Sequence, residues 1–132
     1  MSNWSEVEYL SIASAVEIEI TTRRTDGTLR PWVPIWVIGA GDELYIRSWR
    51  GRSAAWFRHV SAHSEARIRA GSAEYDIAVI DVPRDDAAHP LINQEYQRKY
   101  ARYPTHVPPM LAETAVTATL RLLLAQERHD SQ

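Results

Sequence analysis

The sequence has no cysteine, and that absence excludes several kinds of chemistry at once. Disulfide bridges, thiolate nucleophiles and cysteine-based metal sites are ruled out. No apolar stretch approaches the roughly 20 residues that a helix needs to span a membrane. The N-terminus also lacks the basic segment followed by an apolar run that marks a signal peptide. We therefore expect a cytoplasmic protein without a membrane partner.

A strong charge of either sign is absent too, because the formal net charge of the 132 residues is −2. Proteins that bind nucleic acid usually carry a large positive excess, so no nucleic-acid partner is expected. Lysine occurs once, at Lys99, among 15 basic residues, and the others are arginines. The planar guanidinium group suits paired hydrogen bonds to phosphate or carboxylate groups.

The local signatures of catalysis and phosphate binding are missing as well. There is no G-x-G-x-x-G or P-loop motif, and no serine stands in a nucleophile elbow. His59 and His63 have the four-residue spacing of some metal ligands, but no third ligand is spaced near them. We expect no metal site, and the sequence shows no obvious acid–base machinery of its own.

Alternation of apolar and polar residues, by contrast, is plentiful. Val16, Ile18 and Ile20 alternate with polar residues, which is typical of a half-buried strand. Asp26-Gly27 then predicts a hairpin turn, because glycine accepts a positive φ. The same pattern predicts six strands, at 16–23, 32–38, 43–49, 65–70, 73–82 and 116–125. The last can also be interpreted as a helix, because leucine, alanine and arginine favour helices.

Three short helices complete the prediction. The first begins at a capping box formed by Asn3 or Ser5 and ends near residue 13. Its apolar face is expected to hold Trp4, Val7 and Leu10. The second spans about 54–62 with Ser53 as its cap, and the third runs from 85–89 to about 103, before an irregular proline-rich stretch.

The chain is expected to form one domain, since 45% of its residues are hydrophobic and no linker interrupts it. Its parts are an N-terminal helix in 1–15, a barrel in 16–125 and a loose tail in 126–132. Hairpin connections with few crossovers favour a small antiparallel barrel of the mainly β (α+β) class.

One segment points to a ligand. Arg50-Gly51-Arg52-Ser53 is a basic stretch, expected to be flexible, that leads into the second helix. A positive loop at a helix N-terminus beside an aromatic-rich sheet suits a ligand with a flat ring and a phosphate. The alternative is a solvated loop whose arginines pair with Glu43 or Asp42. Four nearby tryptophans likewise either stack on a ring or pack in a core or interface: Trp32, Trp36, Trp49 and Trp56.

Several motifs, in order, resemble an uncharacterised family grouped with the flavin- and deazaflavin-binding split β-barrels, the pyridoxamine-phosphate-oxidase-like superfamily. They are EIEITTRR at 17–24, DG at 26–27, PIWV at 34–37, LYIRS at 44–48, WFR at 56–58 and IRAG at 68–71. The chain is similar, more loosely, to the deazaflavin-dependent nitroreductases of that superfamily. The resemblance implies a six-stranded antiparallel split β-barrel with three peripheral helices.

The resemblance also implies a homodimer with cofactor sites at its interface. It implies that the cofactor phosphate lies near the end of the third strand, and that the ring lies against the second strand. The residues so placed are Arg47, Ser48, Arg50 and Arg52, with Arg58 as a helper, for the phosphate, and Pro34, Ile35, Trp36 and Trp56 for the ring.

The function that follows is a flavin- or deazaflavin-dependent oxidoreductase, which passes a hydride to or from a small organic substrate. The cofactor is either FMN or the 8-hydroxy-5-deazaflavin coenzyme F420. A second hypothesis is a non-catalytic cofactor carrier or small-ligand binder on the same fold. A third is an interaction module whose tryptophans form the partner surface.

Overall fold

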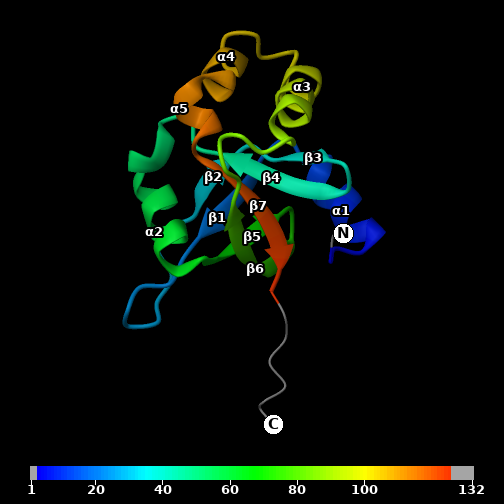
Figure 1. Ribbon diagram of the computed structural model, residues 1–132. Coiled ribbons are helices and arrows are strands. Elements are labelled where there is room, and N and C mark those ends of the chain that lie inside the picture. Colours follow the sequence, from blue (N-terminus) through cyan, green and yellow to red (C-terminus); the bar gives the residue numbers. More distant parts are fainter. Residues whose placement is uncertain (1–2, 126–132) are drawn as a thin grey trace.

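Seven strands form one curled antiparallel sheet in the computed structural model, which describes residues 3–125 (Figure 1). The mainly β prediction is confirmed, but seven strands replace the predicted six. Neighbouring strands follow the order β2-β1-β5-β6-β7-β4-β3. Their bounds are β1 Ile18–Thr21, β2 Val33–Ile35, β3 Ile38–Ala40, β4 Glu43–Arg47, β5 Glu65–Ala70, β6 Ala73–Asp81 and β7 Thr119–Leu124.

The additional strand arises because the predicted strand 32–38 is in fact two strands. β2 pairs with β1, whereas β3 pairs with β4 at the other edge of the sheet. Trp36 and Val37 alone carry the chain from one edge to the other. Three Cα–Cα steps reach at most about 11 Å. The two edges must therefore meet, and the sheet closes into a barrel.

The interior of the barrel is filled by the apolar side chains that the alternation predicted. Each of the following is at most 2% exposed: Ile18, Ile20, Leu44, Ile46, Ile68, Ile77, Leu120 and Leu122. The outer face of β1, β5 and β6 carries ion pairs instead, between Arg69 and Glu19 at 2.8 Å and between Arg67 and Asp76 at 2.9 Å. One wet face and one dry face fix the strand register.

Helix α1 (Glu6–Ala13) lies against β3 and β4. Of the two expected caps, Ser5 is the N-cap, and its capping box with Glu8 is complete. The predicted apolar face is wrong in part. Val7 is 78% exposed, while the fully buried residue is Ile12. The helix is short, so its packing direction follows the barrel rather than its own weak amphipathic pattern.

Helix α2 (Ala55–His63) follows a 3-10 turn, η1 (Gly51–Ser53), and packs against β1, β5 and β6. Ser53 was expected to cap it, but the N-cap residue is Ala54, which has no side-chain hydrogen bond to offer. The helix therefore starts with uncapped backbone amides, a point that matters for the site below.

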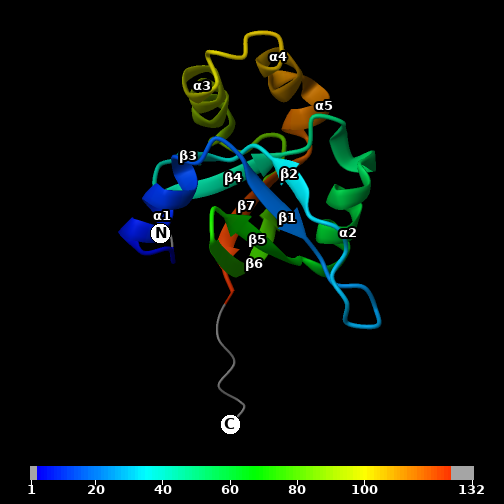
Figure 2. The same cartoon turned by 180° about the vertical axis from the view of Figure 1, so that it is seen from behind.

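The connection from β6 to β7 is a helical excursion, defined here as residues 82–118. It contains α3 (His89–Lys99), α4 (Val107–Leu111) and α5 (Glu113–Val116). The sequence predicted one helix here and an irregular stretch after it, so α4 and α5 are corrections, and the final strand starts at Thr119 rather than 116. The three helices stand together beyond the β3–β4 part of the barrel (Figure 2).

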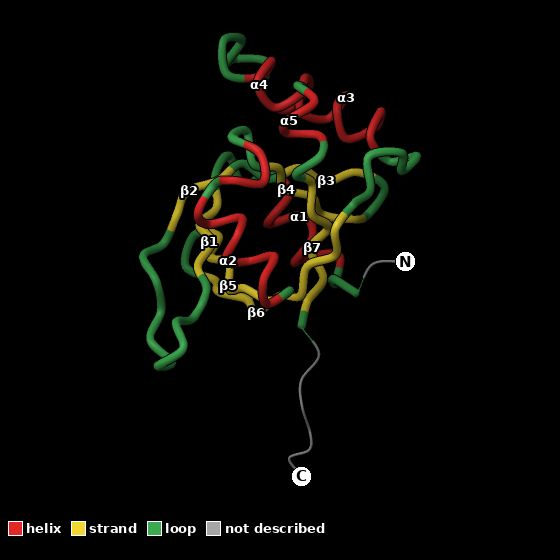
Figure 3. The backbone as a smooth tube through the Cα atoms, turned by 60° about the vertical axis from the view of Figure 1, so that its left-hand side comes forward, coloured by secondary structure: helices red, strands yellow, loops and turns green. Residues whose placement is uncertain are grey.

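A second hydrophobic cluster joins the excursion to the barrel. It combines side chains of α3 and α4 with the outer side of β3 and β4: Ile38, Tyr45, Ile92, Tyr96, Tyr100, Val107 and Met110. Figure 3 shows the strands around a ring, with α3–α5 outside it. None of the helices among residues 3–125 is long and apolar enough to cross a membrane.

Candidate functional site

A pocket of about 630 Å³ lies where β2, the end of β4, the start of α2 and α4 converge. Seven of the nine residues that the sequence predicted for cofactor binding line it: Pro34, Ile35, Trp36, Arg47, Ser48, Arg50 and Trp56. The fold thus brings together side chains from the predicted ring segment and the predicted phosphate segment. Arg52 and Arg58 are not part of this lining.

Aromatic rings supply much of the pocket wall. The indole of Trp36 is half-buried and stacks on the ring of Tyr100, with centroids 3.7 Å apart and planes 1° from parallel. Trp56 is half-buried as well. Trp49 is 56% exposed at the rim, and the guanidinium of Arg50 lies 5.0 Å from its ring centroid. Such a wall suits a flat, apolar ring system.

Arg47 is buried behind this wall, with 1% of its surface exposed. Its Nε donates to Thr119 Oγ1 at 2.9 Å, and its Nη1 donates to Asn93 Oδ1 at 2.6 Å and to the Met110 carbonyl at 2.9 Å. Its Nη2 donates to His89 Nδ1 at 3.0 Å. A guanidinium has five N–H groups, so four bonds leave one of them over. Every protein acceptor in this set is formally neutral.

Beyond these neutral acceptors, the buried charge of Arg47 has only the ring of Tyr96 beside it, with 5.4 Å between the guanidinium carbon and the ring centroid. No carboxylate of residues 3–125 forms an ion pair with it, and burial lowers its pKa. The neighbouring Ser48 is 2% exposed, and its Oγ has no hydrogen-bond partner in the described chain. A buried charge and a buried hydroxyl without partners both cost free energy. An anion in the pocket would supply what both lack.

His89 holds a single tautomer. A guanidinium can only donate, so Nδ1 of His89 must accept and carries no proton. The other ring nitrogen, Nε2, lies 2.8 Å from the carbonyl of Pro83 and must donate. The imidazole is thus neutral with its proton on Nε2, and it ties the start of α3 to the β4 strand through Arg47.

The start of α2 opens onto the same pocket. Ala54, Ala55 and Trp56 line it, and the N-cap makes no side-chain hydrogen bond. The first amides of a helix carry the positive end of its dipole and bind anions readily. Together with the guanidinium of Arg50, they give this end of the pocket a positive character.

The basic loop before α2 was expected to be flexible, but it is anchored. Gly51 is buried with φ +81°, against the side chain of Thr114. Arg52 pairs with Asp81 at 3.0 Å and donates to the Thr117 carbonyl at 2.7 Å. The turn needs glycine at this position, because other residues rarely adopt such a φ.

The arginines of this region therefore differ in what they can offer a ligand. Arg52 is engaged as described, and Arg58 donates to the Ser53 carbonyl at 3.3 Å. The side chain of Arg50 makes no hydrogen bond or ion pair within the described residues and only lies over Trp49. Neither Asp42 nor Glu43 is the partner of Arg52. Arg50 is thus the arginine of the loop that can turn to an anion.

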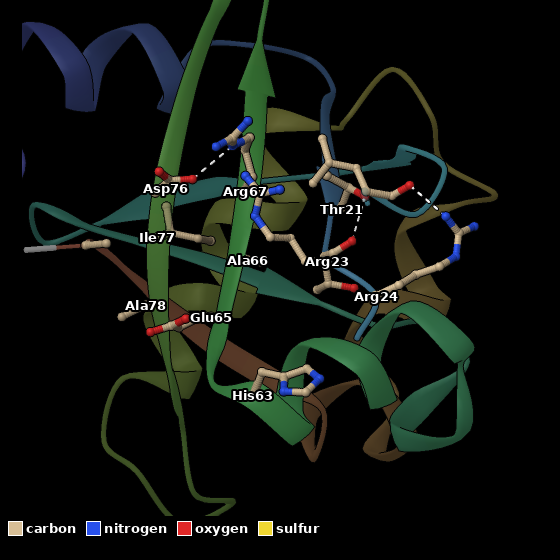
Figure 4. A pocket seen from close by; sticks show the side chains of 13 residues that line it. Thr21, Arg23, Arg24, His63, Glu65, Ala66, Arg67, Asp76, Ile77 and Ala78 are labelled. Carbon is tan, nitrogen blue, oxygen red and sulfur yellow. Dashed lines mark hydrogen bonds and ion pairs between the residues drawn. The ribbon is translucent and has the colours of Figure 1, made fainter. Parts of the chain in front are cut away.

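A second pocket, of about 710 Å³, lies on the other side of the barrel between the β1–β2 connection, the end of α2, β5 and β6 (Figure 4). The three arginines in its lining already have protein partners. Arg67 pairs with Asp76, Arg23 donates to the Gly27 carbonyl at 2.8 Å, and Arg24 to the Leu29 carbonyl at 2.9 Å. None of the nine predicted site residues lines this pocket, which is the more polar of the two. Within residues 3–125, no group of three potential ligands could hold a metal ion.

Residues of the excursion complete the first pocket, and sequence reasoning did not place them there. His106, Pro109 and Met110 line it, and Tyr100 backs Trp36. Tyr96, Tyr100 and Tyr103 follow one another at near-helical spacing in the sequence. The Tyr100 hydroxyl does not enter the pocket lining and donates to the Val16 carbonyl at 2.7 Å. The proline-rich sequence of α4 contains no local pattern that would have predicted a helix or a place in the pocket.

The curled sheet and its helices have the split β-barrel fold of several solved structures that resemble this chain. The chain belongs to the family DUF2255, described as an uncharacterized protein conserved in bacteria, whose model matches residues 8–122. The family resemblance expected from the motifs is thereby confirmed. No curated protein matches the chain significantly.

Solved structures support the fold at low sequence identity. HutZ, the heme storage protein from Vibrio cholerae, matches with a TM-score of 0.61 and 13% identity, over 96% of this chain and 93% of its own. A FAD-binding protein from Mesorhizobium loti matches with a TM-score of 0.60 and 15% identity, over 93% and 90%. An F420 reductase matches with a TM-score of 0.51 and 14% identity, over 92% and 94%.

Proposed function

We propose that the first pocket binds a flavin-type cofactor, FMN in particular, and that the protein uses it to transfer a hydride to or from a small organic molecule. The observation that carries this proposal is the buried Arg47 without a counter-ion, next to a buried Ser48 hydroxyl without a partner, at one pocket. A cofactor phosphate would compensate both. The residues present fit such a group.

In this proposal the phosphate lies at the start of α2. Ser48 Oγ, the guanidinium of Arg50 and the first-turn amides of Ala55 and Trp56 bind it directly, and Arg47 contributes its charge from behind. Arg52 and Arg58, which the sequence suggested, have no place in it, because both are engaged outside the pocket lining.

The ring lies along β2, between Pro34, Ile35 and Trp36 on one side and Trp56 on the other. FMN supplies the hydride chemistry when bound, while this chain holds the ring, excludes water and orients the substrate. FMN is preferred to F420 because one free guanidinium and one helix start suit a single phosphate. The longer acidic tail of F420 would meet Glu17, which lines the same pocket.

Two features of the relatives are consistent with this assignment but do not carry it. One neighbour is named a FAD-binding protein and another an F420 reductase, so the fold accommodates flavin-type rings.

We also propose that the protein forms a homodimer that covers the pocket, since Trp49 is exposed at its rim. Light scattering of the purified protein measures its mass and decides that point.

A binding measurement tests the proposal. FMN is titrated with protein and followed by its fluorescence, and retention on a desalting column is checked by colour. Arg50→Ala removes a charged hydrogen bond worth about 1.5–3 kcal/mol, so the Kd should rise about 10- to 100-fold. Arg58→Ala removes the same charge nearby and should leave the Kd within about twofold.

Ser48→Ala separates binding from stability. Without ligand, removing a buried hydroxyl that lacks a partner should leave the free energy of unfolding unchanged or raise it by about 1 kcal/mol. FMN binding should nevertheless weaken about 3- to 10-fold. Wild-type protein that retains no FMN at micromolar concentration would refute the cofactor proposal. Tight binding of F420 without binding of FMN would identify F420 as the cofactor instead. Oxidation of bound reduced FMN by quinone or nitro acceptors distinguishes an enzyme from a carrier.

A further inference from the structure

Trp36, the aromatic wall of the pocket, sits where the sheet is interrupted between β2 and β3. The next residue, Val37, is fully buried there. Side chains at the C-terminal end of α3 form hydrogen bonds with its backbone N–H and C=O groups. The amide of Val37 donates to the hydroxyl of Tyr100 at 3.2 Å, and the ammonium of Lys99 donates to the Val37 carbonyl at 2.5 Å. Helix α3 therefore replaces the ladder bonds that the interruption removes.

Lys99, the last residue of α3, and Tyr100, its C-cap, make different contacts. The hydroxyl of Tyr100 has one proton, and its shorter contact is with the Val16 carbonyl at 2.7 Å, against 3.1 Å to the Val37 carbonyl. Lys99 is therefore the principal donor to the Val37 carbonyl. The Tyr100 ring meanwhile supports the Trp36 indole by stacking at 3.7 Å.

We propose that Lys99 and Tyr100 are positioning residues, which fix the Trp36 indole as the surface on which a planar ligand stacks, although neither lines the pocket itself. The inference rests on the proposed function for its ligand but not for the coupling between α3 and Trp36. It assigns a ligand-dependent role to the chain's single lysine, 62 residues away from the carbonyl it binds.

A buried lysine at position 99 lowers the stability of the folded protein, and this loss of stability supports a functional role for Lys99. Burial lowers its pKa to about 8, and the nearby positive charge of Arg98 adds to that lowering. No carboxylate among residues 3–125 forms an ion pair with it. Its charged form thus disfavours the folded state at neutral pH, and a neutral side chain would serve stability better.

The same titration predicts a pH dependence. Above about pH 8 the amine is neutral and becomes a weaker donor to the Val37 carbonyl, so the Trp36 wall loosens. Tyr100 and Tyr96 keep their protons in this range, because burial raises the pKa of both, and Glu17 adds to the increase for Tyr100. We expect planar ligands to bind more weakly as the pH rises from about 7 to about 9.

A ligand-free measurement tests the coupling. The five indole N–H resonances are followed by NMR between about pH 7 and pH 9.5, and Trp36→Phe identifies the resonance of Trp36. In the wild type this resonance should titrate with a midpoint near pH 8. The titration should vanish in Lys99→Met and in Lys99→Arg, and it should persist in the matched control Arg98→Met. A Trp36 resonance that does not change with pH in the wild type would overturn the inference.

A binding measurement tests the consequence. FMN should bind the wild type about 3- to 10-fold more weakly at about pH 9 than at about pH 7. Lys99→Arg should bind tightly at both values, and Lys99→Met weakly at both. Equal affinities in all three proteins at both values would refute the positioning role while leaving the cofactor proposal intact. Absence of FMN binding at any pH would refute the cofactor proposal instead, and the NMR titration would still decide the coupling.

Discussion

Replacing Gly51 by alanine tests whether the loop before α2 is as tightly anchored as the structure indicates. Gly51 has φ +81°, and an added Cβ would lie 2.5 Å from Thr114 Cγ2 and 3.5 Å from the Thr114 carbonyl oxygen. The left-handed backbone costs an L-residue about 1–2 kcal/mol. The overlap with Thr114 costs about 1–3 kcal/mol more. Gly51→Ala should therefore lower the free energy of unfolding by about 2–5 kcal/mol.

Two further variants separate these contributions. Gly71 also has a positive φ, +62°, but nothing lies within 4 Å of an added Cβ. Gly71→Ala should therefore cost only the backbone part, about 1–2 kcal/mol. Thr114→Ser removes the methyl group that the new Cβ would strike. In the Gly51→Ala background it should restore about 1–2 kcal/mol, although alone it costs less than about 1 kcal/mol.

Urea unfolding followed by circular dichroism measures the wild type and the four variants, and the midpoint and slope give the free energies. Equal losses of unfolding free energy for Gly51→Ala and Gly71→Ala would show that η1 and α5 are not in close contact. So would a Gly51→Ala protein whose free energy of unfolding does not recover when Thr114→Ser is added. The rigid presentation of Arg50 next to Gly51 would then lose its structural basis.

Three further variants test other parts of the fold by urea unfolding. Burial lowers the pKa of Lys99 from its ordinary value of 10.5 to about 8, a difference worth about 3.4 kcal/mol that solvent screening reduces to about 1–2. The wild-type free energy of unfolding should therefore rise by about 1–2 kcal/mol from about pH 8 to 10. Equal pH profiles for wild type and Lys99→Met would contradict this. His89→Phe leaves a donor of Arg47 unpaired and should cost about 2–4 kcal/mol, whereas an unchanged midpoint would mean that the network is dispensable. Ser5→Ala removes the capping box with Glu8 and should cost about 1 kcal/mol; no loss would show that α1 is held by packing alone.

Local patterns were sufficient to predict the hairpins of this fold. The β5–β6 hairpin follows from strict alternation on both sides of Gly71, which takes the positive φ that its turn needs. The division at Trp36 and Val37 could not be predicted in the same way. Both halves of 32–38 are apolar, and only the closure of the barrel decides that one half pairs with β1 and the other with β4.

The site shows the same contrast. Trp36, Ser48 and Arg50 line the pocket, and the sequence could single them out because each lies in or beside a short motif. The environment of Arg47 was out of reach, since its partners Thr119 and His89 stand 72 and 42 residues away in the chain. Long-range packing makes the Arg47 guanidinium the buried centre of a network of neutral acceptors.

The helical excursion separates two strands that nevertheless pair directly with each other. β6 and β7 are in register from Ile77 with Leu124 to Asp81 with Leu120, so the pairing of these two strands uses no residue of 82–118. Positions of that segment that do not contact the barrel, unlike His89, Lys99 and Tyr100, can therefore change without altering this pairing. Because the same segment supplies His106, Pro109 and Met110 to the pocket, substitutions in it can change the pocket wall while the β6–β7 pairing is kept. Grafting this segment from one homologue into another should transfer ligand preference along with it.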